Sequence, residues 1–401
     1  MHNLTKIKIY RLLLRISYLP SLLFIFPFAL LRKKNTSKLF FFFDRYAIGG
    51  AQKVHLDILE SVSDTFKMVF FTRKSINKKL KQTFYSLPLT ENHDIHFWCD
   101  NLLFRLFSVH YFAFFLNRHT EGIVLSSNST FFYDMLPFLK KIYRIELLHN
   151  FTYGNHGMEF FGLANRRYLD KRLVIDGVTR NKIEAQYKAF KIDQTCLNKV
   201  EVIEYGVYIP ASLSRKDGLP LRILYAGRGG PQKRVWLINQ IAEYCMNRQL
   251  PVEFHFAGTM QADLSEMVKA NAIMHGEIGN QDEMNSVYAL CHVITLTSAY
   301  EGFPVFIKEG MAFGCVPVVT ALEGNKLHLE HLSNALLIDE ITDESQVVSL
   351  GIKNLQLLID RPDLLNTLSK NAYQYASKHF GKTIFLNRYR EILLKNVQPK
   401  D

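Results

Sequence analysis

The sequence predicts an α/β protein made of two Rossmann-like domains, each with a parallel sheet and helices on its faces. Three observations support this fold class. Short β-rich runs alternate with segments long enough for crossover helices, which is the pattern of parallel sheets. The alternation stops at a polar stretch, residues 211–220, and restarts at Leu221. The 401 residues also exceed one ordinary domain, so two domains of typical size are expected.

The first domain is expected over residues 38–208. Its opening strand, Lys38–Phe43, is followed by a glycine turn at Gly49 and Gly50 and then by helical spacing of apolar residues. This succession is the usual start of a doubly wound domain. The further strands expected in it are Lys67–Thr72, Gly122–Ser127, Arg144–Asn150, Lys171–Asp176 and Val200–Val207.

The second domain is expected over residues 221–378, after a linker at 209–220. Its first strand, Leu221–Gly227, leads into a basic glycine loop and a helix. The strands expected after these are Val252–Gly258, Ala272–Ile278, Val293–Ser298 and Val316–Thr320. The amphipathic end of the chain, residues 379–401, predicts a helix that packs back across the domains. An interdomain cleft is the expected ligand site.

Composition restricts the partners and cofactors. Apolar residues make up 48% of the chain and charged residues 21%, which supports a large core rather than disorder. The formal net charge of +12 indicates an anionic partner: nucleic acid, an acidic membrane surface or a phosphorylated ligand. The five cysteines include no C-x-x-C pair, and no H-E-x-x-H or D-x-D pattern occurs. No disulfide framework, metal or other cofactor is therefore predicted, and the cysteine pattern fits a reducing cytoplasm.

Residues 1–37 predict a basic and apolar helical extension that associates with a membrane. The chain up to Lys38 carries eight Lys or Arg residues and no Asp or Glu. Its apolar run, residues 16–31, is shorter than the ~20 residues of a spanning helix, and Pro20 and Pro27 interrupt it. Basic residues, not a small-residue cleavage site, follow the run, which argues against a signal peptide. We prefer an interfacial helix on anionic lipid; a spanning helix and a helix docked on the protein itself stay open.

A second aromatic stretch, Leu103–His119, contains two arginines among many apolar residues. It predicts a buried helix, with a membrane-facing or acceptor-facing helix as the alternative.

The strongest functional pattern follows the expected strand Val293–Ser298. Gly302 allows a sharp turn, Pro304 suits the first position of a helix, and Gly314 suits its C-terminal end. Such a helix aims free N–H groups and the positive end of its dipole at a ligand, for which a diphosphate is the natural candidate.

Two carboxylates accompany this helix. Glu301 precedes it, and Glu309 lies about five residues inside it, or about 7–8 Å further along the axis. One carboxylate can accept hydrogen bonds from sugar hydroxyls and the other from ribose hydroxyls, on opposite sides of a diphosphate. The alternative is a pair of solvated surface glutamates.

A basic glycine loop, Gly227–Arg234, is the second functional pattern. Arg228 and Lys233 lie five residues apart directly after a strand, where they can bind a phosphate. Such cations stabilise a departing nucleoside diphosphate without a metal. The spacing matches neither G-x-x-x-x-G-K-[ST] nor G-x-G-x-x-G, and a plain basic surface loop is the alternative.

Taken together, these blocks resemble the GT-B retaining glycosyltransferases of the family 4 type, also called glycosyl transferases group 1. The likeness covers nearly the whole chain after Lys38. It implies that Glu301 and Glu309 match the family's Glu-x7-Glu contacts to donor sugar and ribose, and that Gly227, Arg228 and Lys233 match its phosphate loop.

The resemblance implies further site residues. The amides of Gly302 and Phe303, next to Pro304, would hold the diphosphate, and the Gly49–Gly50 loop would let the backbone approach the donor. His149 is similar to a histidine that lies near the transferred sugar, with a structural histidine as the alternative.

Four positions depart from the family pattern. Arg234 stands where glycine is usual, Tyr205 where asparagine is usual, Gln52 where glutamate is common, and Asp176 where serine or threonine is frequent. None removes a charge that the chemistry needs, so a divergent member is indicated.

The resemblance implies a retaining, metal-independent transfer of a sugar from a nucleotide-sugar donor. Arg228, Lys233, Glu301 and His149 are the catalytic candidates. We expect a lipid-linked saccharide acceptor in bacterial surface polysaccharide or lipopolysaccharide synthesis, an anionic membrane surface as partner, and no nucleic acid. The expected place is the cytoplasm, peripheral or monotopic at the inner face of the cytoplasmic membrane. A nucleotide-sugar epimerase or hydrolase and a non-catalytic nucleotide-sugar-binding protein are the alternatives.

Overall fold

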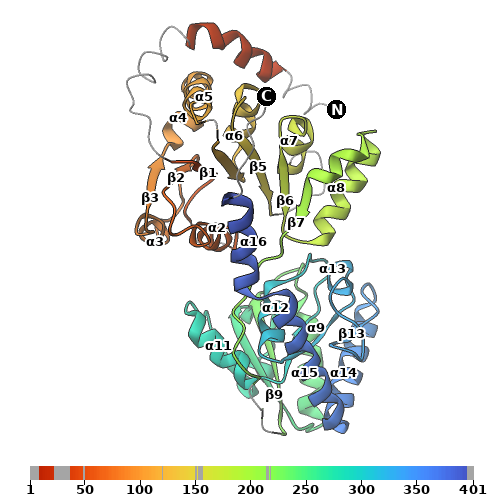
Figure 1. Cartoon of the computed structure of the whole chain (residues 1–401). Coiled ribbons are helices and arrows are strands. Elements are labelled where there is room, and N and C mark those ends of the chain that lie inside the picture. The colour runs from red at the N-terminus through yellow and green to blue at the C-terminus, as the bar shows by residue number, and fades with distance from the viewer. Residues whose placement is uncertain are drawn as a thin grey trace. The chain divides into compact units, whose positions relative to one another are not determined.

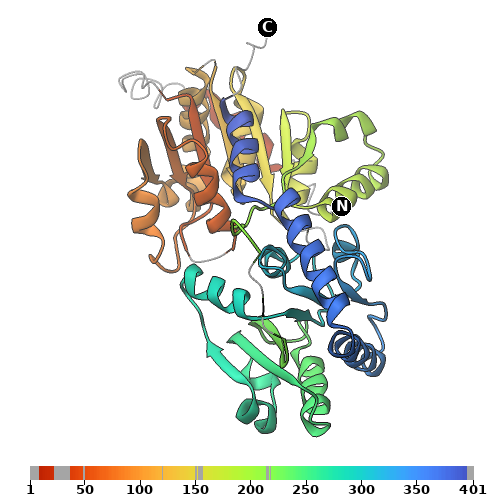
Figure 2. The ribbon, with the colours of Figure 1, turned by 60° about the horizontal axis from the view of Figure 1, so that its bottom comes forward.

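The computed structural model describes residues 9–21, 37–47, 50–119, 121–149, 151, 157–213, 216 and 218–394. The chain divides into two compact units (Figure 1). Unit 1 comprises the described residues up to Glu204 together with those from Leu386 onwards, and unit 2 comprises those within Tyr205–Phe385. Each unit is a sheet of parallel strands flanked by helices (Figure 2). The predicted α/β class with two parallel sheets is therefore confirmed.

The unit 1 sheet has the strand order β3-β2-β1-β4-β5-β6-β7, so the chain reverses direction across the sheet between β1 and β4. Its strands are β1 (Leu39–Phe43), β2 (Lys67–Phe71), β3 (Thr90–Asp94), β4 (Ile123–Ser127), β5 (Tyr143–Leu148), β6 (Lys171–Val174) and β7 (Val200–Val202). Every residue of β1 is buried because helices cover both faces of a parallel sheet.

The helices of unit 1 follow the expected crossovers. They are α2 (Gly50–Glu60), α3 (Lys81–Tyr85), α4 (His96–Asp100), α5 (Leu102–Asn117), α6 (Thr130–Met135), α7 (Met158–Asn165) and α8 (Gly177–Ala189), with short 3-10 turns at Leu136–Phe138 and Gln194–Lys199. Most residues of α5 from Ser108 to Leu116 are buried, as a core helix requires, whereas its first turn is exposed.

The unit 2 sheet has the order β10-β9-β8-β11-β12-β13, with the reversal between β8 and β11. Its strands are β8 (Leu221–Arg228), β9 (Val252–Thr259), β10 (Ile273–Gly276), β11 (Val293–Leu296), β12 (Val316–Thr320) and β13 (Leu336–Ile338). This is the strand order of a doubly wound nucleotide-binding domain.

The helices of unit 2 are α9 (Val235–Asn247), α10 (Glu266–Asn271), α11 (Gln281–Leu290), α12 (Val305–Ala312), α13 (Glu323–Lys326), α14 (Glu344–Asp360) and α15 (Pro362–His379), with a 3-10 turn at Gln261–Asp263. The last helix, α16 (Lys382–Leu394), begins in unit 2 and ends in unit 1.

The N-terminal extension is described only in part, and residues 9–21 of it form a helix. The later part of the predicted apolar run, from residue 22 onwards, lies outside the described residues. None of the helices in the described segments combines the length and the apolarity that a membrane crossing requires.

Candidate functional site

The candidate site of unit 2 lies where its strand order reverses. β8 and β11 are parallel neighbours, so the loops that follow them emerge at the same edge of the sheet. These two loops, residues 229–234 and 297–304, carry five of the eight site residues predicted in unit 2. Ligands of doubly wound sheets bind at this point, beyond the carboxyl ends of the strands.

Backbone bonds tie the two loops together. The Ala299 N–H donates to the Gln232 carbonyl at 2.9 Å, and the Gln232 side chain donates to the Tyr300 carbonyl at 3.2 Å. Lys233 and Glu301 then form an ion pair, with 2.5 Å between Nζ and Oε1 and side chains only 18% and 14% exposed. The structure therefore brings together two residues that the sequence assigned to separate motifs.

Arg228 ends β8 and is exposed at the start of the same loop. Within the described part of the chain, no ion pair or hydrogen bond of its guanidinium is found, so this cation can reach an incoming anion. Its backbone carbonyl accepts a 2.6 Å hydrogen bond from the Tyr225 hydroxyl. Burial, then the carboxylates of Glu301 and Asp263, raise the pKa of Tyr225, so this hydroxyl remains a donor.

Two backbone amides of the glycine loop already have hydrogen-bond partners outside the loop. The Gly229 N–H donates to the Thr259 carbonyl at 2.8 Å, and the Gly230 N–H donates to the Asp263 carboxylate at 2.9 Å. These two amides are therefore occupied. The phosphate-binding capacity of this loop belongs to the side chains of Arg228 and Lys233 rather than to its glycine backbone.

Free amides come instead from the start of α12. Pro304 is the N-cap of this helix, one position before the predicted place. The N–H groups of Ile307 and Lys308 both donate to the Pro304 carbonyl, so those of Val305 and Phe306 have no partner within the helix. Gly314, at φ +70°, follows the helix C-terminus as predicted.

Glu309 is the fifth residue of α12 and is held by α11. Its carboxylate accepts hydrogen bonds from the Tyr288 hydroxyl at 2.8 Å and from the Gln281 amide at 3.3 Å. Burial, reinforced by that carboxylate, raises the pKa of Tyr288, so its hydroxyl stays protonated. Glu301 and Glu309 thus have separate supports, one on the glycine loop and the other on α11.

Three residues that the sequence did not assign support the site. Arg234 adopts φ +48° at the N-cap of α9 and is buried. Its guanidinium donates to the carbonyls of Thr297 at 2.8 Å, Ser298 at 3.2 Å and Ile341 at 2.8 Å. Arg234 therefore binds the end of β11 to the start of α9.

Lys308 and Gly324 complete the support. Lys308 is buried, with its ammonium over the rings of Phe380 at 4.9 Å and Phe303 at 5.6 Å. At Gly324, in α13, a Cβ atom would lie 1.8 Å from the Gly302 carbonyl oxygen, so only glycine lets α13 approach this turn. Close backbone approach is visible only in three dimensions, which is why sequence inspection missed it.

The predicted site residues of unit 1 are a separate group. Gly49 lies outside the described residues, and Gly50 opens α2, where a Cβ atom would have no other atom within 4 Å. His149 follows β5, with its Nε2 atom 3.1 Å from Nε2 of His55 in α2. Burial lowers the pKa of His149 to about 4 and, together with His149, that of His55, so both imidazoles are neutral.

Asp176 of unit 1 has a local structural role. It is the N-cap of α8, and its carboxylate accepts the Thr179 N–H at 2.6 Å. An aspartate caps a helix as well as serine or threonine does. Across the described segments, no group of three or more His, Cys, Asp or Glu side chains has the arrangement of a metal site.

Comparison with known proteins agrees with this geometry. The family model described as "Glycosyl transferases group 1" matches residues 220–350, so this part of the chain carries a glycosyl transferases group 1 domain. No curated protein sequence matches the chain.

Solved structures show the same overall fold. Anabaena Alr3699/HepE in complex with UDP is similar with a TM-score of 0.67 at 17% identity, over 89% of this chain and 99% of that one. The lipopolysaccharide outer core galactosyltransferase WaaB, in its apo form, gives 0.65 at 17% identity over 90% and 100%. A glycosyltransferase from Rickettsia africae gives 0.65 at 14% identity over 90% and 100%. The chain therefore has the GT-B fold.

Proposed function

We propose that the protein is a retaining, metal-independent glycosyltransferase that moves a sugar from a nucleotide-sugar donor to a lipid-linked saccharide. The product would belong to bacterial surface polysaccharide or lipopolysaccharide. The observation that carries the proposal is the Lys233–Glu301 ion pair at the reversal point of the unit 2 sheet, beside exposed Arg228 and the start of α12.

The arrangement suits a nucleoside diphosphate as leaving group. Departure of the diphosphate develops negative charge, which Arg228, Lys233 and the free amides of α12 would stabilise. Lys233 would turn from the Glu301 carboxylate towards the phosphate, which frees Glu301 to accept hydrogen bonds from sugar hydroxyls. Glu309, already oriented by Tyr288, would accept those of the ribose.

The remaining steps concern the acceptor. No enzymatic nucleophile stands out in the sequence, so retention would come from front-side attack, with the departing phosphate taking the proton of the acceptor hydroxyl. Neutral His149 would donate or accept a hydrogen bond near the transferred sugar. Some similar structures hold UDP or UDP-glucose, which makes UDP-sugars the first donors to test.

The same proposal places the enzyme in the cytoplasm, peripheral or monotopic at the inner face of the membrane. Nucleotide sugars are made in the cytoplasm, and the basic N-terminal extension suits an anionic lipid surface. WaaB, which has the same fold, is described as a lipopolysaccharide outer core galactosyltransferase.

Two substitutions test the site directly. Arg228→Ala and Lys233→Ala should each lower sugar transfer by roughly 10²-fold, the usual effect of losing one preorganised donor to a developing anion. The measurement is release of nucleoside diphosphate in the presence of acceptor lipid extract. Lys269→Ala removes a partly exposed lysine of unit 2 that pairs with Glu266; it is the control and should keep wild-type turnover. Wild-type rates in both site variants would remove the assignment.

The same assay distinguishes the transferase from the alternative functions. An epimerase or hydrolase would convert the donor without any acceptor, whereas the transferase needs the lipid-linked saccharide. A non-catalytic binding protein would show donor binding with no turnover under either condition.

A further inference from the structure

One surface of unit 1 exposes apolar side chains on two elements. The first element is the helix of residues 9–21, which docks on unit 1 by one face. Leu14 is buried against the core there. Arg11 donates to the Asn165 side chain at 2.7 Å, and Ser17 lies 3.1 Å from Nε2 of His110 in α5. These contacts determine which face of the helix points outwards.

The outward face of this helix is apolar. Ile9, Leu12, Leu13, Ile16 and Leu19 are between 44% and 71% exposed. They follow the three- and four-residue spacing of one helix face. Arg15 is the exposed charge among them, and residues 9–21 include no acidic residue. Exposing an apolar face of this composition to water costs free energy, and such faces usually mark a site of contact with a partner.

The second element is an aromatic tip, which we define as Phe97, Trp98, Leu102, Leu103 and Phe104 at the junction of α4 and α5. These side chains are between 40% and 69% exposed. The three aromatic rings touch one another, with centroids 5.2 to 5.6 Å apart. Aromatic side chains exposed as a cluster are unusual on a protein surface in water.

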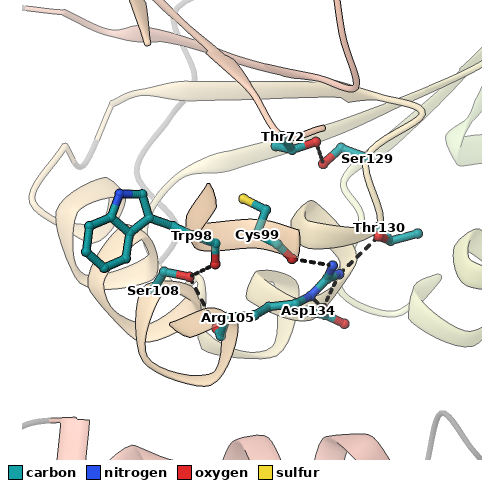
Figure 3. Close-up of polar contacts among 8 residues, drawn as sticks. All are labelled: Thr72, Trp98, Cys99, Arg105, Ser108, Ser129, Thr130 and Asp134. Carbon is teal, nitrogen blue, oxygen red and sulfur yellow. Dashed lines mark hydrogen bonds and ion pairs between the residues drawn. The ribbon is translucent and has the colours of Figure 1, made fainter. Parts of the chain in front are cut away.

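Polar contacts beneath the tip hold it in place (Figure 3). Arg105 donates to the Asp134 carboxylate at 2.6 and 2.8 Å and to the Cys99 carbonyl at 3.1 Å. Ser108 donates to the Trp98 carbonyl at 3.1 Å. The tip therefore presents its rings from a rigid base and does not need to fold before it binds.

The two apolar surfaces adjoin across α5. Ser17 of the N-terminal helix lies within 3.5 Å of the Leu106 carbonyl, one helical turn from Leu102 and Leu103. Figure 1 shows this helix, in red, beside α5. One extended partner can therefore contact both surfaces at once.

We propose that the outer face of helix 9–21 and the aromatic tip insert together into one lipid bilayer that contains anionic headgroups. The charges favour this partner, because the chain up to Lys38 carries eight basic residues and no acid. Aromatic residues, tryptophan above all, prefer the boundary between headgroups and acyl chains. The inference deepens the membrane location proposed above by adding a second contact, in the globular part of unit 1.

The two contacts should differ in their dependence on charge. The tip has the exposed acid Asp100 beside it and offers chiefly apolar area, so its contribution should be insensitive to salt. The N-terminal segment combines apolar area with basic residues, so its contribution should fall as salt rises.

Intrinsic fluorescence gives a direct test, because the protein has two tryptophans. In full-length Trp236→Phe, Trp98 is the sole reporter. Its emission should shift to shorter wavelength, and brominated lipid should quench it, on addition of vesicles of 70% phosphatidylcholine and 30% phosphatidylglycerol. In full-length Trp98→Phe, the reporter Trp236 belongs to unit 2, and its emission should not change. Vesicle binding without any change at Trp98 would overturn the two-contact proposal.

Vesicle flotation of surface variants gives an independent test. Trp98→Ser with Leu103→Ser should weaken partitioning by at least about tenfold at low and at high salt, from the apolar area removed. Leu12→Ser with Ile16→Ser should weaken it by a similar factor. Leu290→Ser, an exposed leucine of unit 2, is the control and should bind as wild type does. Equal binding by the tip variant and the control would overturn the proposal.

Neither test uses a donor sugar or turnover. Failure of vesicle binding would therefore remove the membrane contacts and leave the Arg228 and Lys233 assignments standing. Loss of those assignments would equally leave the vesicle result intact.

Discussion

At the scale of single residues, buried polar groups with defined partners decide the local chemistry. His55 and His149 show this in unit 1. Their Nε2 atoms lie 3.1 Å apart, so one must donate and the other accept, and both atoms cannot carry a proton. The pair therefore couples the tautomer of His149, the residue that the sequence linked to the transferred sugar, to that of His55.

The histidine pair predicts how stability depends on pH. Because burial lowers the pKa of His149 to about 4, the unfolded chain binds more protons than the folded one between about pH 6.5 and pH 4. The free energy of unfolding should thus be fully retained above about pH 6.5 and should fall as the pH is lowered, by about 3 kcal/mol from His149 alone.

Urea unfolding of unit 1, followed by Trp98 fluorescence in the Trp236→Phe background, measures this dependence. His149→Gln should show a smaller loss of stability between pH 7 and pH 4.5 than its parent. His379→Gln, which removes an exposed histidine of unit 2, should match the parent. An unchanged pH dependence in His149→Gln would contradict the explanation.

Arg234 makes the same point in unit 2. The sequence marks it as a departure from glycine, and a left-handed φ of +48° is costly for arginine. Its three hydrogen bonds to backbone carbonyls offset that cost and join two elements of the site. Arginine at this position therefore lacks the backbone freedom that glycine would have, but its side chain joins two elements that a glycine could not join.

At the scale of elements, the site depends on short helices packed at the end of the sheet. α13 has four residues, yet it lies against the turn that carries Glu301 and Gly302. Gly324 makes this possible because its missing side chain leaves room for the Gly302 carbonyl.

Substitution of this glycine should disturb the site without touching a ligand. In Gly324→Ala the new Cβ atom would meet backbone rather than a flexible side chain, so the turn must move. We expect sugar transfer to fall by up to roughly 10²-fold, the effect of a displacement near 1 Å in a preorganised site. Steady-state donor kinetics provide the measurement.

Gly279→Ala is the matched control, since no atom lies within 4 Å of its Cβ position. It should retain wild-type kinetics. Equal kinetics in the two alanine variants would show that the close approach of α13 has no role in catalysis.

The secondary structure also shows where patterns in the sequence are weak. The edge strand β3, Thr90–Asp94, was not predicted because its sequence, TENHD, has no apolar run. β13, three residues long at the edge of the unit 2 sheet, was not predicted either. Buried strands of the interior were predicted to within a few residues at their ends, since their continuous apolar runs follow directly from burial on both faces.

At the scale of the whole molecule, the donor should bind residues of unit 2 that come from β8, from the loops 229–234 and 297–304, and from α12. A donor that binds only the folded state should stabilise the protein by about 2.7 kcal/mol at one hundred times its dissociation constant. A thermal-shift screen of UDP-, GDP- and ADP-sugars on the full-length protein is the measurement, and one nucleotide should stand out.

Hydrogen exchange locates that effect. Protection on donor binding is expected in residues 228–234 and 298–309, and Arg228→Ala should show less of it at equal ligand concentration. Stabilisation by none of the three nucleotide classes would contradict a nucleotide-sugar site in unit 2.

The sequence by itself determined the fold class, most of the strands and the residue types of the donor motifs, because hydrophobic period, glycine turns and charge are local properties of a chain. Only the tertiary structure decided that Lys233 pairs with Glu301, that the glycine-loop amides are occupied, that Arg234 and Gly324 support the unit 2 site, and that His55 contacts His149 in unit 1. These relations join residues far apart in the chain, and their existence depends on how strands align at one edge of a sheet. A contact between two residues that are far apart in the chain produces no repeating pattern in the sequence, so the sequence alone does not reveal it.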